Sequence, residues 1–205
     1  MFRPHWLRPL IAACGFLLLA AAPSPQAQLT PQDAALAERA RLYLQDMGSA
    51  HSRFTQIDSR GTQSQGEIWL QRPGRARLDY APPSGLIIAS DGHSVTVQDR
   101  RLKTLQSYPL GMTPLSLFLS RQIRLDRGVS ITQVNHQPDG FSIVARDARK
   151  RNPGQIELMF KAAPLSLTGW TITDPRGTQV RVRLGDLEPA KAHDQGFFEI
   201  WREGR

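Results

Sequence analysis

The pattern of apolar residues changes once along the chain, and its first part is helical. From position 31, apolar residues recur at helical spacing for about 17 residues, and polar residues occupy the other faces. The segment begins with a capping hydroxyl on Thr30, a proline at Pro31 and an acid at Asp33, the order typical of a helix start. Gly48 then supplies a stop. We therefore predict an amphipathic helix whose apolar face packs on another element. The apolar face holds Leu36, Ala40, Tyr43, Leu44 and Met47.

From position 50 onward, apolar residues recur at every second position instead. In segment 178–184, for example, Val180, Val182 and Leu184 alternate with polar residues, which is the period of a β-strand. Turn signals such as Asp91-Gly92 separate the segments. About eleven short strands separated by turns predict an antiparallel meander that curls into a barrel or sandwich. The predicted strands are 51–58, 66–72, 75–80, 85–90, 94–98, 129–134, 141–146, 155–160, 165–173, 178–184 and 197–201.

One apolar segment interrupts the predicted meander. Thr113 and Pro114 repeat the capping pattern, and a helix of about two turns follows that is apolar on more than one side. Such a helix must be enclosed, so we expect the short helices to cover the open mouth of a single curved, unclosed half-barrel. The chain contains no repeat or low-complexity linker, which favours one domain over residues 28–205. The apolar residues of the short helix are Leu115, Leu117, Phe118 and Leu119.

The N-terminus has the layout of a secretory signal. Arg3 and Arg8 form a basic start, an apolar run follows at 10–22, and small residues lead out of it. We expect residues 1–27 to be a cleaved signal peptide, with the alanines at 20–22 as the alternative cleavage site. A retained anchor is a further alternative, but the apolar run is shorter than the roughly 20 residues that span a bilayer.

Cysteine content and charge agree with export. The single cysteine, Cys14, lies inside the signal; a lipid anchor there is an alternative, although the apolar run continues past it. Cleavage would remove this thiol and leave a mature chain without disulfides. The net charge of +8 falls to about +6 and is mostly arginine, which fits a charged surface or, alternatively, binding to an anionic membrane or acidic partner. Nucleic-acid binding fits poorly with export.

The sequence shows no arrangement of residues typical of catalysis. It contains no HExxH, GxSxG, P-loop or GxGxxG motif, and Asp186 with Glu188 fits a loop-facing pair better than a catalytic one. The basic segment 146–151 fits a solvated turn or, alternatively, a docking patch. We therefore predict a binding protein, not an enzyme, with no metal and no cofactor. The isolated histidines of the mature chain are His51, His93, His136 and His193.

Four sequence motifs follow one another between positions 54 and 119: FTQ at 54–56, GEIWLQRPGRARLDYAPP at 66–83, IASDG at 88–92 and YPLGMTPLSLFL at 108–119. In this order they resemble the LolA family of periplasmic outer-membrane lipoprotein carriers. The resemblance implies a curved, unclosed antiparallel sheet covered by a helical lid, in a periplasmic monomer. It also implies that the protein takes triacylated lipoproteins from an inner-membrane ABC transporter and passes them to an outer-membrane receptor of the same fold.

In this family, the arginine of the strand-end Arg-Pro pair holds the lid closed, and Arg72 occupies that position here. A guanidinium offers several donors, and the carbonyls at a helix C-terminus lack intrahelical partners. Each such bond nets roughly 1.5–3 kcal/mol, enough to hold a lid that cargo can still displace. Trp69 lies three residues earlier, hence on the opposite face of a regular strand, but alternation does not decide which face lines the cavity.

The resemblance and the apolar pattern together suggest which residues form the acyl-chain cavity and lid. The sequence has Ala76 and Leu78 where relatives often carry aromatics, which favours a more aliphatic lining. An additional C-terminal element found in some relatives is not expected. The predicted cavity and lid residues are Leu36, Tyr43, Leu44, Met47, Trp69, Leu70, Leu78, Tyr80, Ile88, Val95, Val97, Leu115, Phe118 and Leu119.

Other functions remain open at this point. The outer-membrane receptor shares the fold but would need a lipidated cysteine at the end of its signal. A periplasmic domain that senses mislocalised lipoproteins is a second alternative, and such proteins usually carry a further domain. An exported enzyme of sandwich fold is a third, which the missing catalytic residues disfavour.

Overall fold

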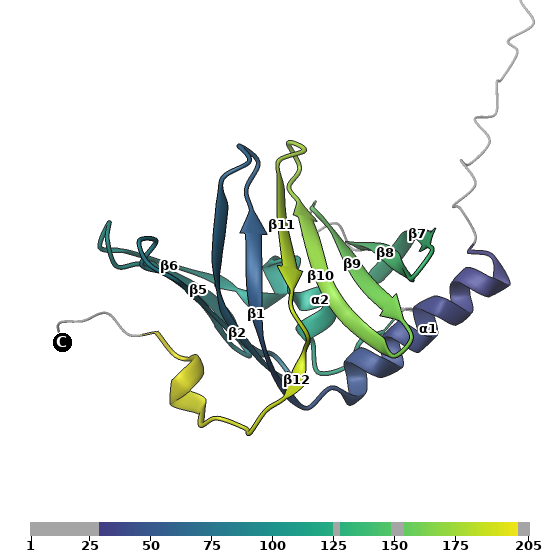
Figure 1. The fold of residues 1–205 in the computed structure, drawn as a ribbon, viewed down its shortest axis with the longest axis horizontal. Coiled ribbons are helices and arrows are strands. Elements are labelled where there is room, and N and C mark those ends of the chain that lie inside the picture. Colours follow the sequence, from purple (N-terminus) through teal and green to yellow (C-terminus); the bar gives the residue numbers. More distant parts are fainter. Residues whose placement is uncertain (1–28, 125–127, 149–153, 201–205) are drawn as a thin grey trace, which may run out of the picture.

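A computed structural model describes residues 29–124, 128–148 and 154–200. These residues form one antiparallel sheet in the order β6-β5-β4-β3-β2-β1-β11-β10-β9-β8-β7, and β12 pairs with β1. The sheet bends strongly, and its end strands β6 and β7 do not pair with each other (Figure 1). The strands are β1 (Ser49–Ile57), β2 (Gln63–Gln71), β3 (Arg75–Tyr80), β4 (Leu86–Asp91), β5 (Ser94–Asp99), β6 (Thr104–Pro109), β7 (Val129–Gln137), β8 (Gly140–Asp147), β9 (Gln155–Ala162), β10 (Leu165–Thr173), β11 (Gln179–Leu184) and β12 (Glu188–Pro189).

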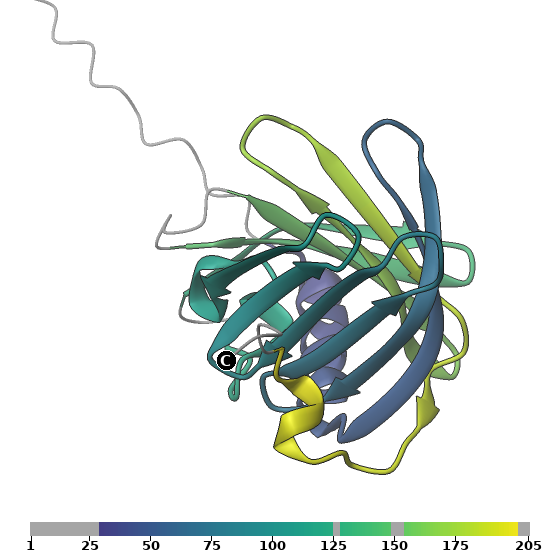
Figure 2. The ribbon, with the colours of Figure 1, turned by 90° about the vertical axis from the view of Figure 1, so that its left-hand side faces the viewer.

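The longest described helix, α1 (Pro31–Asp46), lies within the curve of the sheet (Figure 2). It begins as predicted, because the Thr30 side chain accepts a hydrogen bond from the Asp33 backbone N–H. Ala37 and Ala40 are buried against the sheet, and their small size lets the helix approach closely. Among the described residues, no helix has the length and hydrophobicity that a membrane crossing needs.

A second, shorter helical region covers the centre of the concave face. The 3-10 turn η1 (Leu110–Met112) follows β6 and leads into α2 (Ser116–Leu119). Phe118 and Leu119 of α2 are buried in the core, and Phe118 packs against Trp170 of β10 at 5.6 Å between ring centroids. The predicted unclosed half-barrel with helices across its mouth is therefore confirmed.

Local predictions failed in the short helix and at two places in the strand series. Thr113 does not cap α2; its hydroxyl donates to the Leu110 carbonyl, and α2 begins only at Ser116. Strand β6 was missed because it is an edge strand with mostly exposed, polar side chains, so no apolar alternation marks it. The strand predicted at 197–201 is wrong over its described part, since η2 (Gln195–Phe198) is a 3-10 helix. Trp201 lies outside the described residues.

Candidate functional site

The turn that follows β2 grips the end of α2. Arg72 donates from Nη1 to the Phe118 carbonyl and from Nη2 to the Ser120 carbonyl, the latter at 2.7 Å. The Gly74 N–H donates to the Leu119 carbonyl at 2.7 Å. These carbonyls stand at a helix end, where no intrahelical donor reaches them. The turn thus supplies the donors that α2 lacks, and α2 is held down by polar contacts from a single strand end.

Glycine is needed at position 74 for this approach. Gly74 has a φ of +79°, a conformation that other residues rarely adopt, and a side chain there would come within 2.7 Å of the Gly92 Cα. Its carbonyl accepts a hydrogen bond of 2.6 Å from the buried Ser90 hydroxyl. The turn is therefore fixed from β4 as well as from α2.

Hydrogen bonds offset only part of the cost of burying the Arg72 guanidinium. Burial lowers its pKa to about 10, so the group remains charged at neutral pH. Its Nε is buried and has no hydrogen-bond partner, and among the described residues Arg72 forms no ion pair. A charge held by neutral carbonyls alone is held less firmly than one paired with a carboxylate. The structure thus shows Arg72 bound to α2 by carbonyl contacts, and its predicted role as a lid latch stays a prediction.

The two lid helices are tied to each other through Gln45. The Gln45 side-chain amide donates to the Arg121 carbonyl at 2.9 Å, and its oxygen accepts from the Ile123 N–H at 3.0 Å. One side chain of α1 thereby binds two backbone groups in the segment that follows α2. Near the middle of the sheet, the Tyr43 hydroxyl accepts a hydrogen bond of 3.3 Å from the Leu167 N–H.

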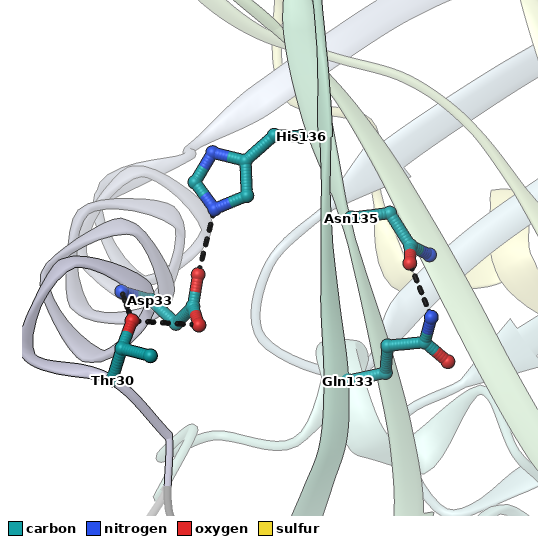
Figure 3. Close-up of polar contacts among 5 residues, drawn as sticks. All are labelled: Thr30, Asp33, Gln133, Asn135 and His136. Carbon is teal, nitrogen blue, oxygen red and sulfur yellow. Dashed lines mark hydrogen bonds and ion pairs between the residues drawn. The ribbon is translucent and has the colours of Figure 1, made fainter.

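The N-terminal end of α1 has its own contact with the sheet. His136 on the edge strand β7 lies 2.7 Å from Asp33, measured from Nε2 to Oδ1, and the Thr30 hydroxyl donates to the other carboxylate oxygen (Figure 3). The hydrogen bond from His136, followed by that from Thr30, lowers the pKa of the Asp33 carboxyl below its ordinary value. Polar contacts near both ends of α1 thus add to its apolar packing.

The concave interior is almost filled in this closed form. The apolar cavity between α1 and strands β7 to β9 has a volume of about 30 Å³, room for no more than about two water molecules. Among the described residues, this cavity leaves no room for an acyl chain, because α1 and the segment that contains α2 themselves occupy the concave face there. The cavity is lined by Ala37, Ala40, Arg41, Leu44, Leu117, Ile123, Val129, Ile131, Ile143, Ala145, Leu158 and Phe160.

Most predicted cavity and lid residues lie in this interior, although their part in acyl binding remains a prediction. Val97 shares the strand face of Val95 but is only partly buried and lies outside the core cluster. Tyr80 donates to the Gln56 side-chain oxygen at 2.6 Å, and burial raises the pKa of its hydroxyl. The fully buried members are Leu44, Leu70, Leu78, Tyr80, Val95, Phe118 and Leu119, and the partly buried ones are Leu36, Tyr43, Met47, Ile88 and Leu115.

Trp69 does not lie in the interior with the other predicted lining residues. Its neighbours Ile68 and Leu70 are 0% and 2% exposed in the core, so alternation directs Trp69 to the convex face. There its ring lies 5.3 Å from that of Phe197 and 5.0 Å from that of His51. The open question about the strand faces is thereby answered: Trp69 serves a second, outer cluster beneath the C-terminal segment.

Sequence reasoning missed the interior residues of the second half of the sheet. Ile143, Leu158 and Phe160 line the small cavity, yet the site prediction stopped at position 119 because the family motifs stop there. Their recurrence at every second position of β8 and β9 was the available signal. Of the basic segment 146–151, Arg146 donates to the Gln155 side chain, and 149–151 lies outside the described residues. Within the described part of the chain, no group of three or more potential metal ligands occurs.

Comparison with known proteins gives a consistent assignment. Residues 45–201 match the family described as "Outer membrane lipoprotein carrier protein LolA". An outer-membrane lipoprotein carrier protein from Alkalilimnicola ehrlichii is 31% identical over 181 residues, which cover 84% of this chain and 82% of that protein. One from Methylococcus capsulatus is 26% identical over 184 residues, covering 85% of each chain. A solved LolA superfamily structure from Nitrosomonas europaea superposes with a TM-score of 0.44 at 7% identity, covering 80% of this chain and 98% of that one.

The family match spans most of the described residues, from the end of α1 through the whole sheet and η2. It includes the strand-end turn that carries Arg72 and the helix α2 that this turn binds. On the strength of this match, the chain belongs to the LolA family of outer-membrane lipoprotein carrier proteins.

Proposed function

We propose that the protein is a periplasmic carrier that binds the acyl chains of lipoproteins released from the inner membrane and delivers them to the outer membrane. The observation that carries this proposal is the lid: apolar helices fill an apolar concave sheet but are fastened by a few polar contacts, foremost Arg72 with α2. Members of the family are carriers, and no enzymatic role is proposed. The relatives' shared description as outer-membrane lipoprotein carriers supports the same function.

Opening the lid would convert the filled interior into a binding site. Movement of α1 and α2 away from the sheet would expose the inner faces of both halves of the sheet, which are lined by aliphatic and aromatic side chains. An acyl chain gains about 0.8 kcal/mol per methylene that leaves water. Cargo would then replace the lid residues on the sheet. A surface without fixed polar partners accepts lipoproteins that differ in their protein part but share the anchor.

The proposed function implies a cellular location and a set of binding partners. Residues 1–27 would direct export and be removed, and residues 28–205 would act as one carrier domain in the periplasm. Its partners would be triacylated lipoproteins, the inner-membrane ABC transporter that releases them and an outer-membrane receptor.

The decisive experiment measures lipoprotein release. Inner-membrane vesicles that contain a radiolabelled lipoprotein and the releasing transporter are incubated with ATP and the purified, processed protein. We expect labelled lipoprotein in the supernatant as a complex with the protein, and none with an exported protein of similar charge. If the label stays in the vesicles, the carrier function is refuted. Mass spectrometry of the mature N-terminus separates the carrier from the lipid-anchored receptor of the same fold, because only the receptor retains a modified cysteine.

A further inference from the structure

The convex face of the sheet carries a packed segment on the side opposite to α1. Residues 193–198, here called the strap, follow β12 and include η2, which lies against β3 and β4 on the side opposite to α1 (Figures 1 and 2). Phe198 of the strap is 1% exposed, and Phe197 stacks on His193 at 4.0 Å between ring centroids. The strap is therefore a packed element and has its own apolar contacts with the sheet.

Polar contacts fix the strap at both of its ends. Near its end, Arg77 of β3 donates to the Phe197 carbonyl at 2.8 Å, and its guanidinium lies 5.0 Å from the centre of the Phe197 ring. At its start, the side chain of Gln71 binds the backbone of His193 in both directions. The Gln71 amide donates to the His193 carbonyl at 3.1 Å, and its oxygen accepts from the His193 N–H at 2.8 Å.

Gln71 is the last residue of β2 and directly precedes Arg72. The strap on the convex face and the lid on the concave face are thus held by consecutive residues of one strand end. Gln71 is 8% exposed, and its side-chain amide and oxygen both bond to the His193 backbone, so loss of the strap removes both hydrogen-bond partners at once. The end of β2 is then released from one of its restraints and can shift. A shift of about an ångström is enough to break hydrogen bonds of the kind that Arg72 makes.

We propose that Gln71 is a positioning residue for the Arg72 latch, through which the strap stabilises the closed lid. The inference rests on the proposed carrier function for its purpose, since it explains how a partner that lifts the strap from the convex face would loosen the lid without touching it. Coupling of this kind is reciprocal, so an opened lid also loosens the strap. The strap thereby offers a way to control uptake and release from outside the cavity.

The test compares lid mobility in single and double variants of the processed protein. Hydrogen exchange of the α2 amides, which lie across the sheet from Gln71, reports lid opening. Binding of a fluorescent long-chain fatty acid reports access to the interior. We expect Gln71→Ala to speed α2 exchange and tighten fatty-acid binding, each by about fivefold, while circular dichroism stays that of the wild type. Gln133→Ala, which removes a glutamine side chain that bonds to Asn135 on β7 (Figure 3), is the matched control and is expected to change neither.

Gln71→Ala is also made in an Arg72→Leu background. This double variant shows whether Gln71 acts by positioning Arg72 or by stabilising the fold in general. If Gln71 acts through Arg72, Gln71→Ala adds nothing once the latch is gone. Phe197→Ala, which weakens the packing of the strap on His193 and Trp69 but leaves Gln71 in place, is expected to follow the same pattern and carries the test if Gln71→Ala fails to fold. Unchanged α2 exchange in these variants, or an equal acceleration with and without Arg72, overturns the proposal.

Failure of this inference can be told apart from failure of the carrier function. The exchange measurement needs no lipoprotein, so coupling can be seen even if the vesicle assay shows no release. Conversely, wild-type release together with unchanged exchange in the Gln71 and Phe197 variants refutes the coupling alone.

Discussion

Replacing Arg72 by leucine removes the fastening that holds α2 while it keeps the turn and the strand. The variant loses the donors to the Phe118 and Ser120 carbonyls, and these carbonyls then find donors only in water, which the open lid admits. A hydrogen bond to a charged group nets roughly 1.5–3 kcal/mol. Burial of the guanidinium, which lowers its pKa to about 10, offsets part of the gain. We therefore assign the contact as a whole about the value of one such bond.

A change of that size in the closing free energy shifts the open population by about 10- to 150-fold. Because cargo binds the open form, affinity for a fluorescent fatty acid is expected to rise by the same factor. Transfer of a bound lipoprotein to outer-membrane vesicles is expected to slow, since the empty carrier no longer gains energy by closing. Arg72→Lys keeps the charge but cannot bridge both carbonyls. Its fatty-acid affinity should therefore lie between those of the wild type and of Arg72→Leu.

The assay is a fluorescence titration of wild type and variants, with urea unfolding as a check on the fold. Arg53→Leu on the convex face of β1, where the side chain is exposed, serves as the control and should bind the probe as the wild type does. If Arg72→Leu is folded and binds the fatty acid with wild-type affinity, the latch does not exist and the reasoning from the carbonyl contacts is refuted.

Three further changes address the other lid contacts. Ala40→Leu overpacks the contact of α1 with the sheet and should lower stability to urea by about 1–3 kcal/mol while tightening fatty-acid binding. Gln45→Ala removes the tie between the lid helices and should speed hydrogen exchange at Ile123, whose N–H it frees, with the α1 interior less affected. His136→Ala should raise the pKa of Asp33 toward its ordinary value, as followed by NMR titration. Because the folded-state pKa of Asp33 is lowered, its contribution to stability is present above about pH 4 and is lost as the pH falls through the folded pKa, and His136→Ala should reduce that loss.

The spacing of apolar residues was sufficient to predict α1 and most of the sheet, and it failed where burial is one-sided or weak. Strand β6 pairs only with β5 and is largely exposed, so nothing in its sequence repeats with period two. The apolar residues around Phe197 and Phe198 imitated a strand, yet they pack as a 3-10 turn on the outer cluster. A local sequence pattern shows which residues are apolar, but it does not show which element buries them.

The polar contacts of the site were also predicted only in part. Arg72 was found through the family resemblance, and the structure shows its contact with α2. Gln45 and Gln71 were not found, because their partners lie 76 and 122 residues away in the chain. An isolated glutamine carries no signal of such a partner. The sequence also could not predict the filled interior, because a list of apolar residues does not show whether the helices pack directly on the sheet.

The filled interior has a consequence for affinity. Removing about 15 methylenes of one acyl chain from water is worth about 12 kcal/mol. In this carrier the chain must displace lid residues that already cover the sheet, and part of the apolar surface of Leu44, Phe118 and Leu119 is then exposed. The net gain is therefore much smaller than the transfer free energy, and the Arg72 contact lowers it further. Under the proposed function, closing of the lid over the empty sheet would repay part of the cost of releasing the acyl chain, and would favour its transfer to a receptor or membrane.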